Sequence, residues 1–296
     1  MNILITGVNG IVGNEIANLL SNEKKYKLFL FTSKKEKIKK KNINRYYQDL
    51  AKPINYNFKI DTIIHCAAKN PLSLIGNNPE DMYRTNMKIT KNIINFSNKK
   101  NVKKIIFLSA MDVYGTIKKK ILYEDYKTLN PNLYGKSKIL SEKLFCKKNN
   151  KFKAICLRIP GVFVSDLTRD RPLIISIIKK IIKNQNVYIY NSKKKFNNII
   201  DAEEIVKFIK VILERKIKNE IYNFSASRPI KFIHVINLIK KIFNSQSKII
   251  NENSKKNSFV ISNKKIREHF DFEISTTKKI INRCCKKILA QKYKFA

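Results

Sequence analysis

Three of the seven glycines in this chain, Gly7, Gly10 and Gly13, form a pattern that suits phosphate binding. They follow the apolar residues 3–5 and lead into residues 11–20, whose apolar positions have helical spacing. Glycine is needed where the backbone adopts positive φ or lies too close to a ligand for a Cβ atom. A helix that begins there points free N–H groups at an anion. The spacing differs from the standard GxGxxG, but it predicts the same dinucleotide pyrophosphate site; a tight turn without a ligand is the alternative interpretation.

A tyrosine and a lysine, Tyr134 and Lys138, form the second pattern with chemical meaning. Residues at i and i+4 lie on one face of a helix, so the phenol and the ammonium would point the same way. A free phenol has a pKa of about 10, and a nearby cation favours its ionised form. The pair therefore predicts proton transfer at a carbinol oxygen while a hydride is exchanged at the same carbon. Because the chain is rich in lysine and has 13 tyrosines, a solvated helix face is the alternative.

Strands and helices alternate along the chain and would position both patterns. Their order predicts a Rossmann-type α/β fold, a doubly wound parallel sheet with its ligands at the carboxyl ends of the strands. Residues 1–160 are expected to form the dinucleotide-binding domain, and residues 161–296 a smaller α/β substrate-binding lobe interleaved with it. The expected strands are 26–31, 61–68, 104–108, 154–157 and 187–190, and the expected helices are 81–96, 134–145, 173–183, 203–213 and 234–243.

The chain is strongly basic, with 62 Lys and Arg against 22 Asp and Glu and a formal net charge of +40. Such a charge often indicates nucleic acid or an anionic membrane as partner. Only nine of the basic residues are Arg, however, and the lysines are spread along the chain beside abundant Asn and Ile. AT-rich codon usage explains these three residue types together, so no specific nucleic-acid partner is expected. The charge would instead attract phosphate-bearing substrates.

The five cysteines and three histidines show no metal-binding or disulfide spacing. The odd number of cysteines favours reduced thiols in the cytoplasm, and no metal is expected. The first residues read as a strand that leads into the glycine turn, so we expect no signal peptide. No apolar run reaches the length of a membrane span, so a cytoplasmic protein without membrane insertion is predicted.

Taken in chain order, these and further motifs resemble the extended short-chain dehydrogenase/reductase family, in its NAD(P)-dependent epimerase/dehydratase group. The resemblance covers nearly the whole chain. The motifs are Thr6–Gly13, Asp49-Leu50, His65–Ala68, Asn86, Leu108–Gly115, Tyr134 with Lys138, and Leu157–Gly161.

The resemblance implies a role for each motif. Tyr134 would be the acid-base residue, and Lys138 would also bond the nicotinamide ribose. Asn86 would belong to a helix that lines the site, an ordinary asparagine at a helix start being the alternative. The implied cofactor contacts are Gly7, Gly10, Ile11, Val12 and Gly13 at the pyrophosphate, Asp49 and Leu50 at the adenine, and Ala67 and Ala68 beside the path to the nicotinamide.

The chain departs from the family pattern where a Ser or Thr hydroxyl normally bonds the reacting oxygen. That position holds Ala110, and the nearest hydroxyl is one residue earlier, at Ser109. Either a bulge presents Ser109 as a catalytic donor or the site works without this donor; loss of such a bond commonly costs ~100-fold. Gly161 stands where sugar-nucleotide enzymes usually have Asn. Met111 replaces the first acid of the dehydratases, which makes dehydration a less favoured reaction.

The cofactor expectation rests on the end of the second strand, where an NAD site would place a carboxylate for the ribose hydroxyls. Ser33 and Lys34 offer a hydroxyl and a cation instead, so NADP(H) is favoured over NAD(H). The expected function is an NAD(P)-dependent oxidoreductase of a nucleotide-activated sugar, favouring 4-keto reduction, in the synthesis of surface-polysaccharide precursors. A 4-epimerase is one alternative, and a non-catalytic dinucleotide- or RNA-binding protein is another. The resemblance also implies a homodimer in which the helices at 81–96 and 134–145 pair across a two-fold axis; a wholly intramolecular core is the alternative.

Overall fold

The computed structural model describes residues 1–296 except 34–41, 72–77, 166, 169–171, 253–256 and 293–296. The chain forms two compact units, each built from separate stretches of sequence. The sheet unit comprises Met1–Thr116, Tyr126–Arg158 and Ile205–Tyr222, and the second unit comprises Ile117–Asp125, Ile159–Glu204 and Asn223–Ala296.

A seven-stranded sheet is the centre of the sheet unit, with the strand order β12-β7-β5-β4-β1-β2-β3. The pairs that join β1 to β2, β1 to β4, β2 to β3 and β4 to β5 are all parallel. The order reverses direction between β1 and β4, which confirms the predicted Rossmann-type, doubly wound fold. The strands are β1 (Asn2–Thr6), β2 (Lys27–Thr32), β3 (Ile43–Tyr47), β4 (Thr62–His65), β5 (Lys104–Ala110), β7 (Lys153–Ile159) and β12 (Glu220–Asn223).

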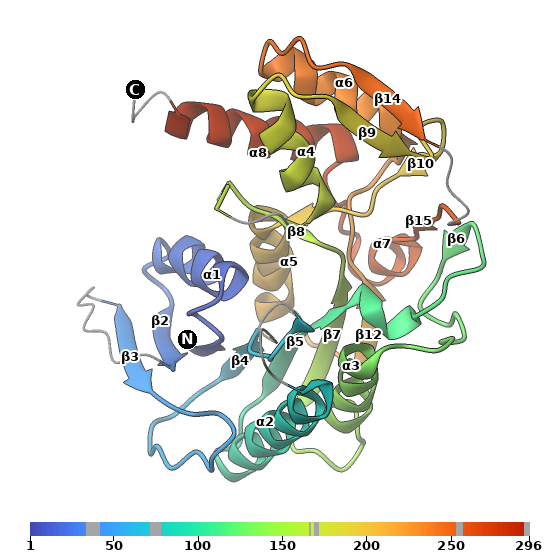
Figure 1. Cartoon of the computed structure of the whole chain (residues 1–296). Helices are drawn as coiled ribbons and strands as arrows, with labels where there is room; N and C mark the ends of the chain where they lie inside the picture. The colour runs from blue at the N-terminus through green and yellow to red at the C-terminus, as the bar shows by residue number, and fades with distance from the viewer. Residues whose placement is uncertain (34–41, 72–77, 166, 169–171, 253–256, 293–296) are drawn as a thin grey trace. The chain divides into compact units, whose positions relative to one another are not determined.

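Helices cover both faces of this sheet (Figure 1). The helices α2 (Pro79–Lys99) and α3 (Leu133–Phe145) pack against each other on one face. The helices α1 (Ile11–Ser21) and α5 (Ala202–Glu214) lie on the other face. Lys25, in the loop after α1, pairs with Glu214 of α5 at 2.9 Å. Coverage on both faces explains why the central strands are buried: every residue of β4 is buried, and so is β1 from Ile3 onward.

Two asparagines start the helices that carry the candidate site. Asn78 caps α2, its side chain accepting a bond from the Glu80 N–H. Asn132 caps α3 by accepting a bond from the Gly135 N–H at 2.7 Å. Because such caps satisfy otherwise unpaired N–H groups, they fix where α3 begins and therefore where Tyr134 lies. Both helices agree with the predicted ranges to within a few residues.

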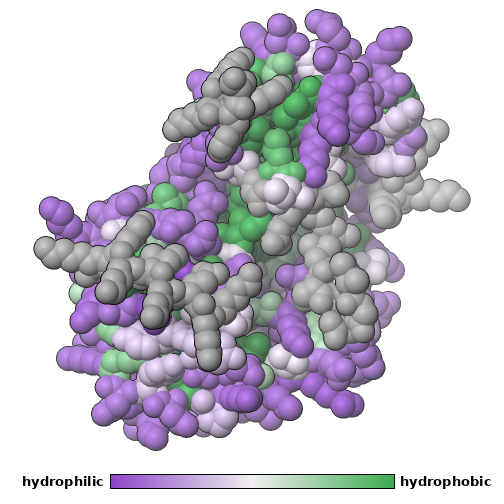
Figure 2. Space-filling model, turned by 60° about the vertical axis from the view of Figure 1, so that its left-hand side comes forward, coloured by the Kyte–Doolittle hydropathy of each residue, from purple (hydrophilic) through white to green (hydrophobic). Residues whose placement is uncertain are grey.

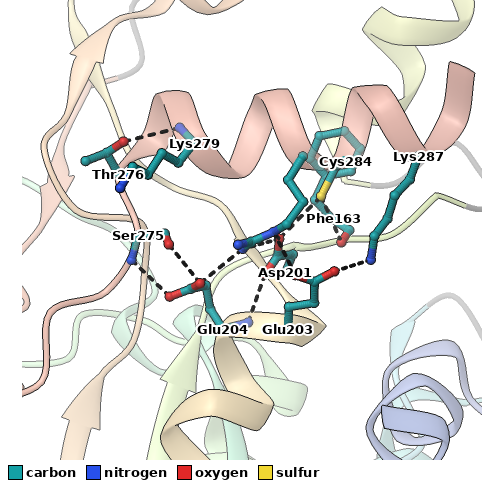
Figure 3. A network of polar contacts seen from close by, with 10 residues as sticks. Phe163, Asp201, Glu203, Glu204, Ser275, Thr276, Lys279, Cys284 and Lys287 are labelled. Carbon is teal, nitrogen blue, oxygen red and sulfur yellow. Dashed lines mark hydrogen bonds and ion pairs between the residues drawn. The ribbon is translucent and has the colours of Figure 1, made fainter.

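The second unit consists of short strand pairs and helices. Its strands pair as β8 (Val162–Phe163) with β11 (Ile200–Asp201), β9 (Val187–Tyr190) with β14 (Ile249–Glu252), β6 (Ile121–Leu122) with β15 (Val260–Ile261), and β10 (Lys195–Phe196) with β13 (Ile230–Lys231). Its helices are α4 (Leu173–Ile182), α6 (Phe232–Ile242), α7 (Lys264–Phe270) and α8 (Thr277–Lys292). Arg283 of α8 bonds the carboxylates of Asp201 and Glu204 beside the start of α5, in the polar network of Figure 3.

Hydrophilic residues cover most of the surface visible in Figure 2. This fits lysines that are dispersed over the chain rather than collected in one basic tract. Among the residues that the structure describes, no helix has the length and apolarity needed to cross a membrane.

Candidate active site

The glycine turn after β1 is packed so closely that side chains would not fit at two of its three positions. Gly7 has a φ of +77°, and a Cβ atom added there would lie 2.6 Å from the Ala67 nitrogen. A Cβ atom on Gly13 would lie 2.4 Å from the Gly7 oxygen. At Gly10 the nearest atom would be the Gly7 oxygen at 3.3 Å, and its backbone is in the extended region. Folding therefore explains Gly7 and Gly13, but it does not demand glycine at position 10.

The start of α1 is suited to an anion. Gly10 is the N-cap residue, no side chain caps the helix, and its first turn has no acidic residue. Ile11 and Val12 form the first turn and are partly exposed, whereas Gly13 is buried. Free N–H groups and the positive end of the helix dipole attract phosphate. The turn thus fits a dinucleotide pyrophosphate, with its open position at Gly10.

The end of β2 lies beside this turn and is tied to it by Asn9. The Asn9 Oδ1 atom accepts bonds from the Thr32 hydroxyl and the Ser33 N–H, both at 2.8 Å. Asn9 stands within the glycine motif but was not among the predicted site residues. Lys34, the other predicted contact, lies outside the described residues.

The two predicted adenine contacts follow β3. Asp49 is exposed and accepts a bond from the Ala51 N–H at 2.9 Å. Leu50 is buried in the core of the sheet unit, and its carbonyl accepts a bond from the Asn92 side chain at 2.9 Å. The carboxylate of Asp49 is therefore open to a ligand, whereas the side chain of Leu50 packs against its own protein.

The segment after β4 packs against the glycine turn. Its Ala67 N–H points at the Thr6 hydroxyl at 3.4 Å, and that hydroxyl lies 2.7 Å from His65 Nδ1. Burial, and then the charge of Lys138, lower the pKa of His65 to about 3, so this buried imidazole is neutral. Ala67 and Ala68 remain partly exposed. Both alanines thus border the turn with small side chains, which leaves room for a ligand.

Asn86 joins the segment after β4 to α3. Its side chain accepts a bond from the Lys69 N–H at 2.9 Å and donates to the Lys69 carbonyl at 3.0 Å and to the Ser137 hydroxyl at 3.2 Å. Asn86 is buried well inside α2, whose cap is Asn78, so the alternative of a helix-start asparagine is wrong. These bonds hold the α3 residue next to Lys138 in register with the loop that follows β4.

Tyr134 and Lys138 come together on α3 at the carboxyl end of β5. The Lys138 Nζ atom donates to the Leu108 carbonyl at 2.8 Å, lies 4.5 Å from the Phe107 ring and 5.6 Å from the Tyr134 ring. Burial lowers the pKa of Lys138 to about 8, although the negative groups around it oppose this shift. An ammonium has three N–H donors, so two remain for the phenol and for a ligand hydroxyl.

The phenol itself behaves differently from the expectation. Burial, and then the nearby carboxylate of Asp112, raise the pKa of Tyr134 above its usual value. The Lys138 Nζ atom lies 5.6 Å from the Tyr134 ring, but burial and Asp112 are the causes of this pKa shift. In the protein without a bound, positively charged nicotinamide ring, Tyr134 is therefore a protonated phenol, which can donate a proton but not accept one.

Ser109, the residue before Ala110 on β5, bonds to a group outside this pair. Its buried hydroxyl donates to Oε1 of Glu142 on α3 at 2.6 Å. Ala110 continues the strand in an extended conformation, with φ −141° and ψ 160°. A catalytic role for Ser109 stays a prediction, and it would require the bond to Glu142 to be exchanged for one to a substrate.

Comparison with known proteins agrees with this geometry. Residues 3–225 match the family model described as the NAD dependent epimerase/dehydratase family. The chain belongs to this family. An inverting UDP-N-acetylglucosamine 4,6-dehydratase of Campylobacter jejuni is 27% identical over 234 residues, which cover 75% of this chain and 66% of the relative. A UDP-glucose 4-epimerase of Lactobacillus helveticus is 24% identical over 272 residues, or 82% of each chain.

The fold also matches solved structures of sugar-nucleotide enzymes. The crystal structure of UDP-glucose 4-epimerase from Thermotoga maritima with UDP-glucose superposes with a TM-score of 0.81, covering 99% of this chain and 100% of that one. At 18% sequence identity, this similarity concerns the fold alone.

Proposed function

We propose that this protein is an NAD(P)-dependent oxidoreductase of a nucleotide-activated sugar, and that it reduces a 4-keto group by hydride transfer. The observation that carries the proposal is the placement of Tyr134 and Lys138 at the end of β5. The neighbouring strand is β4, and the segment that follows β4 packs against the glycine turn. Membership of the epimerase/dehydratase family supports the reaction class. The names of its relatives support a sugar nucleotide as substrate.

The state of the phenol favours reduction. Reduction of a ketone needs a proton for the carbonyl oxygen, and Tyr134 is kept protonated by burial and Asp112. Lys138, buried and bonded to the Leu108 carbonyl, can stabilise the phenolate that remains. A bound NAD(P) would supply or accept the hydride. The glycine turn and the segment after β4 would bind and orient it.

The proposed cofactor preference is for NADP(H). The described end of β2 has no carboxylate, and Asn9 holds Ser33 beside the glycine turn. A carboxylate at this point would repel a 2′-phosphate, whereas the Ser33 hydroxyl, which donates to Asn9 Oδ1 at 3.3 Å, would donate to the phosphate by exchanging this partner. The overall basic charge of the chain adds attraction for an additional phosphate.

A 4-epimerase is the second candidate, because relatives of this chain bear that name. An epimerase oxidises and re-reduces the same carbon, so it needs no net supply of reduced cofactor. A reductase consumes NADPH in proportion to product. In either case the product would be a precursor for surface polysaccharides, which is the role we propose for it.

The deciding experiment offers the purified protein NADPH and NADH in fluorescence titrations and then tests turnover on UDP-sugars and 4-keto UDP-sugars. We expect tighter binding of NADPH and loss of its absorbance with a 4-keto substrate. Interconversion of two UDP-hexoses without net cofactor consumption would favour the epimerase. Binding of neither dinucleotide would refute the proposal and leave a non-catalytic role.

A further inference from the structure

A stripe of functional side chains on α3 continues beyond the catalytic pair. Tyr134, Lys138 and Glu142 follow one another at i, i+4 spacing, which places them on one face of the helix. The proposed reaction uses the first two. Glu142 is a buried carboxylate, only 1% exposed, and burying a charge is costly unless it is well paired.

Glu142 is fully engaged with two strands of the sheet. Its Oε1 atom accepts bonds from the Ser109 hydroxyl of β5 at 2.6 Å and from Arg158 Nε of β7 at 3.0 Å. Its Oε2 atom accepts a bond from Arg158 Nη2 at 2.8 Å. Burial opposes the charge of Arg158, but the hydrogen bond and charge of Glu142 outweigh it and raise the pKa of Arg158. One carboxylate therefore links α3 to both β5 and β7.

The bonds on β5 are consecutive along the strand. The Leu108 carbonyl accepts the bond from Lys138, and the Ser109 hydroxyl of the next residue donates to Glu142. Two neighbouring strand residues thus contact two helix residues that lie one turn apart. This pairing sets the register of α3 against the end of β5, and with it the position of the Lys138 ammonium.

We propose that Glu142 is a positioning residue of the active site: through Ser109 and Arg158 it holds α3 in the register that places Lys138 at the end of β5. The proposal rests on the function proposed above. It also assigns Ser109 a supporting role, which accounts for a buried hydroxyl beside the missing donor at Ala110.

Glu142 has an electrostatic effect on Lys138 as well as a mechanical one. Burial lowers the pKa of Lys138, and Glu142 is one of the groups that oppose this shift. Arg158 is not among the groups that act on Lys138, so removal of both members of the ion pair would still remove support for the ammonium. The titratable groups that interact with Lys138 are Cys66 and His65 from the β4 segment, Asp112 beside α3, Glu142 on α3 and Cys156 on β7.

The chain provides a matched control in its second unit (Figure 3). Glu204 is also 1% exposed, and it accepts bonds from the Ser275 hydroxyl at 2.8 Å and from Arg283 at 3.1 Å. As at Glu142, a buried glutamate binds one serine and one arginine, although Arg283 also pairs with Asp201 and Glu203. Glu204 has no place in the proposed reaction, so Glu204→Gln reports the effect of losing a buried carboxylate away from the candidate site.

The test compares Glu142→Gln, the double variant Glu142→Gln/Arg158→Gln and Glu204→Gln. Each is followed by melting temperature, by NADPH affinity from pH 6 to 10 and by turnover. Glu142→Gln removes the carboxylate that balances the charge of Arg158 and should be destabilised, and the double variant should regain stability because the charge of Arg158 is removed as well. In the double variant the fall of NADPH affinity at alkaline pH should still move to lower pH, because Glu142 no longer supports the charge of Lys138. Its kcat should drop about tenfold or more, since small displacements of catalytic groups are costly.

The outcomes separate the two proposals. If the wild-type protein binds no dinucleotide, the proposed function fails, whatever the variants do. If the wild type binds NADPH but the double variant has the wild-type pH dependence and kcat, Glu142 is only structural and the inference fails. A pH shift of the same size in Glu204→Gln would also overturn it, because the effect would then belong to any lost buried charge.

Discussion

A methyl group added at Gly10 should affect the protein differently from one added at Gly13. The comparison distinguishes a role in cofactor binding from a role in folding. Gly10→Ala adds a methyl group whose nearest neighbour is the Gly7 oxygen at 3.3 Å, at a backbone position with φ −86° and ψ 153° that alanine readily adopts. Gly13→Ala adds one at 2.4 Å from the same oxygen and 2.7 Å from the Gly7 carbon. Gly7 cannot retreat, because it is itself packed against Ala67.

The magnitudes follow from these distances. At Gly10 the free protein should lose no more than about 1 kcal/mol, the difference between glycine and alanine as N-cap residues. At Gly13 the overlap with backbone should cost about 1–3 kcal/mol or more, of which the better helix propensity of alanine returns up to about 1 kcal/mol. Each kcal/mol lowers the melting temperature by about 2–4 °C in a domain of this size.

The assay measures the melting temperature and the NADPH dissociation constant of both variants. Gly10→Ala should melt close to the wild type but bind NADPH at least about tenfold more weakly, a loss of about 1.4 kcal/mol, because its methyl group lies where phosphate would approach the helix. Gly13→Ala should melt several degrees lower. Wild-type affinity in a correctly folded Gly10→Ala protein would refute the reasoning, since the turn would then not contact the pyrophosphate.

Four further predictions address the chemistry, the pH dependence and the assembly. Tyr134→Phe should remove most turnover but leave NADPH affinity nearly intact, whereas Lys138→Ala should reduce both, as steady-state kinetics and titration will show. Ala110→Ser should raise kcat by up to about 100-fold if the site lacks an oxyanion donor; unchanged kcat would mean that the phenol suffices. Because the pKa of His65 is about 3 in the fold and ordinarily about 6.5, only the unfolded chain takes up this proton. The free energy of unfolding should therefore fall as the pH drops from about 6.5 towards 3, and His65→Gln should flatten that slope in urea titrations. Light scattering at micromolar concentration should show a dimer through α2 and α3, and Leu140→Glu, on a partly exposed position of α3, should give a monomer.

The fold could be predicted from the sequence because its central strands contain short apolar runs. Residues 3–5 of β1 and residues 63–64 of β4 are buried and apolar, and no other element type suits such short runs between helices. The strand β3 was missed. Its sequence INRYY has polar residues between apolar ones, and its residues Asn44–Tyr46 are only partly buried. It forms because β2 offers a free edge with which it pairs in parallel, which is tertiary information.

The sequence indicates the candidate site residues, but it does not indicate their bonding partners or protonation states. Gly7 and Gly13 carry a local signal, since few other residues tolerate such a turn. The bond between Ser109 and Glu142 joins residues 33 positions apart, and no periodicity within either segment indicates it. The raised pKa of Tyr134 depends on burial, which appears only in the folded chain. The use of residues 161–296 as a substrate-binding lobe stays a prediction.

The absence of a hydroxyl at Ala110 affects how Tyr134 would act in the proposed reduction. In a site with a second donor, the reacting oxygen is held by two groups, and the phenol can ionise while the other donor keeps the oxygen in place. Here Ser109 is bound to Glu142, so Tyr134 is the described hydroxyl that is left at the end of β5 to bond that oxygen. A phenol that must both hold the oxygen and exchange the proton works best when it starts protonated, and burial with Asp112 ensures this. In the proposed reduction, Tyr134 would therefore both hold the carbonyl oxygen and give it the proton.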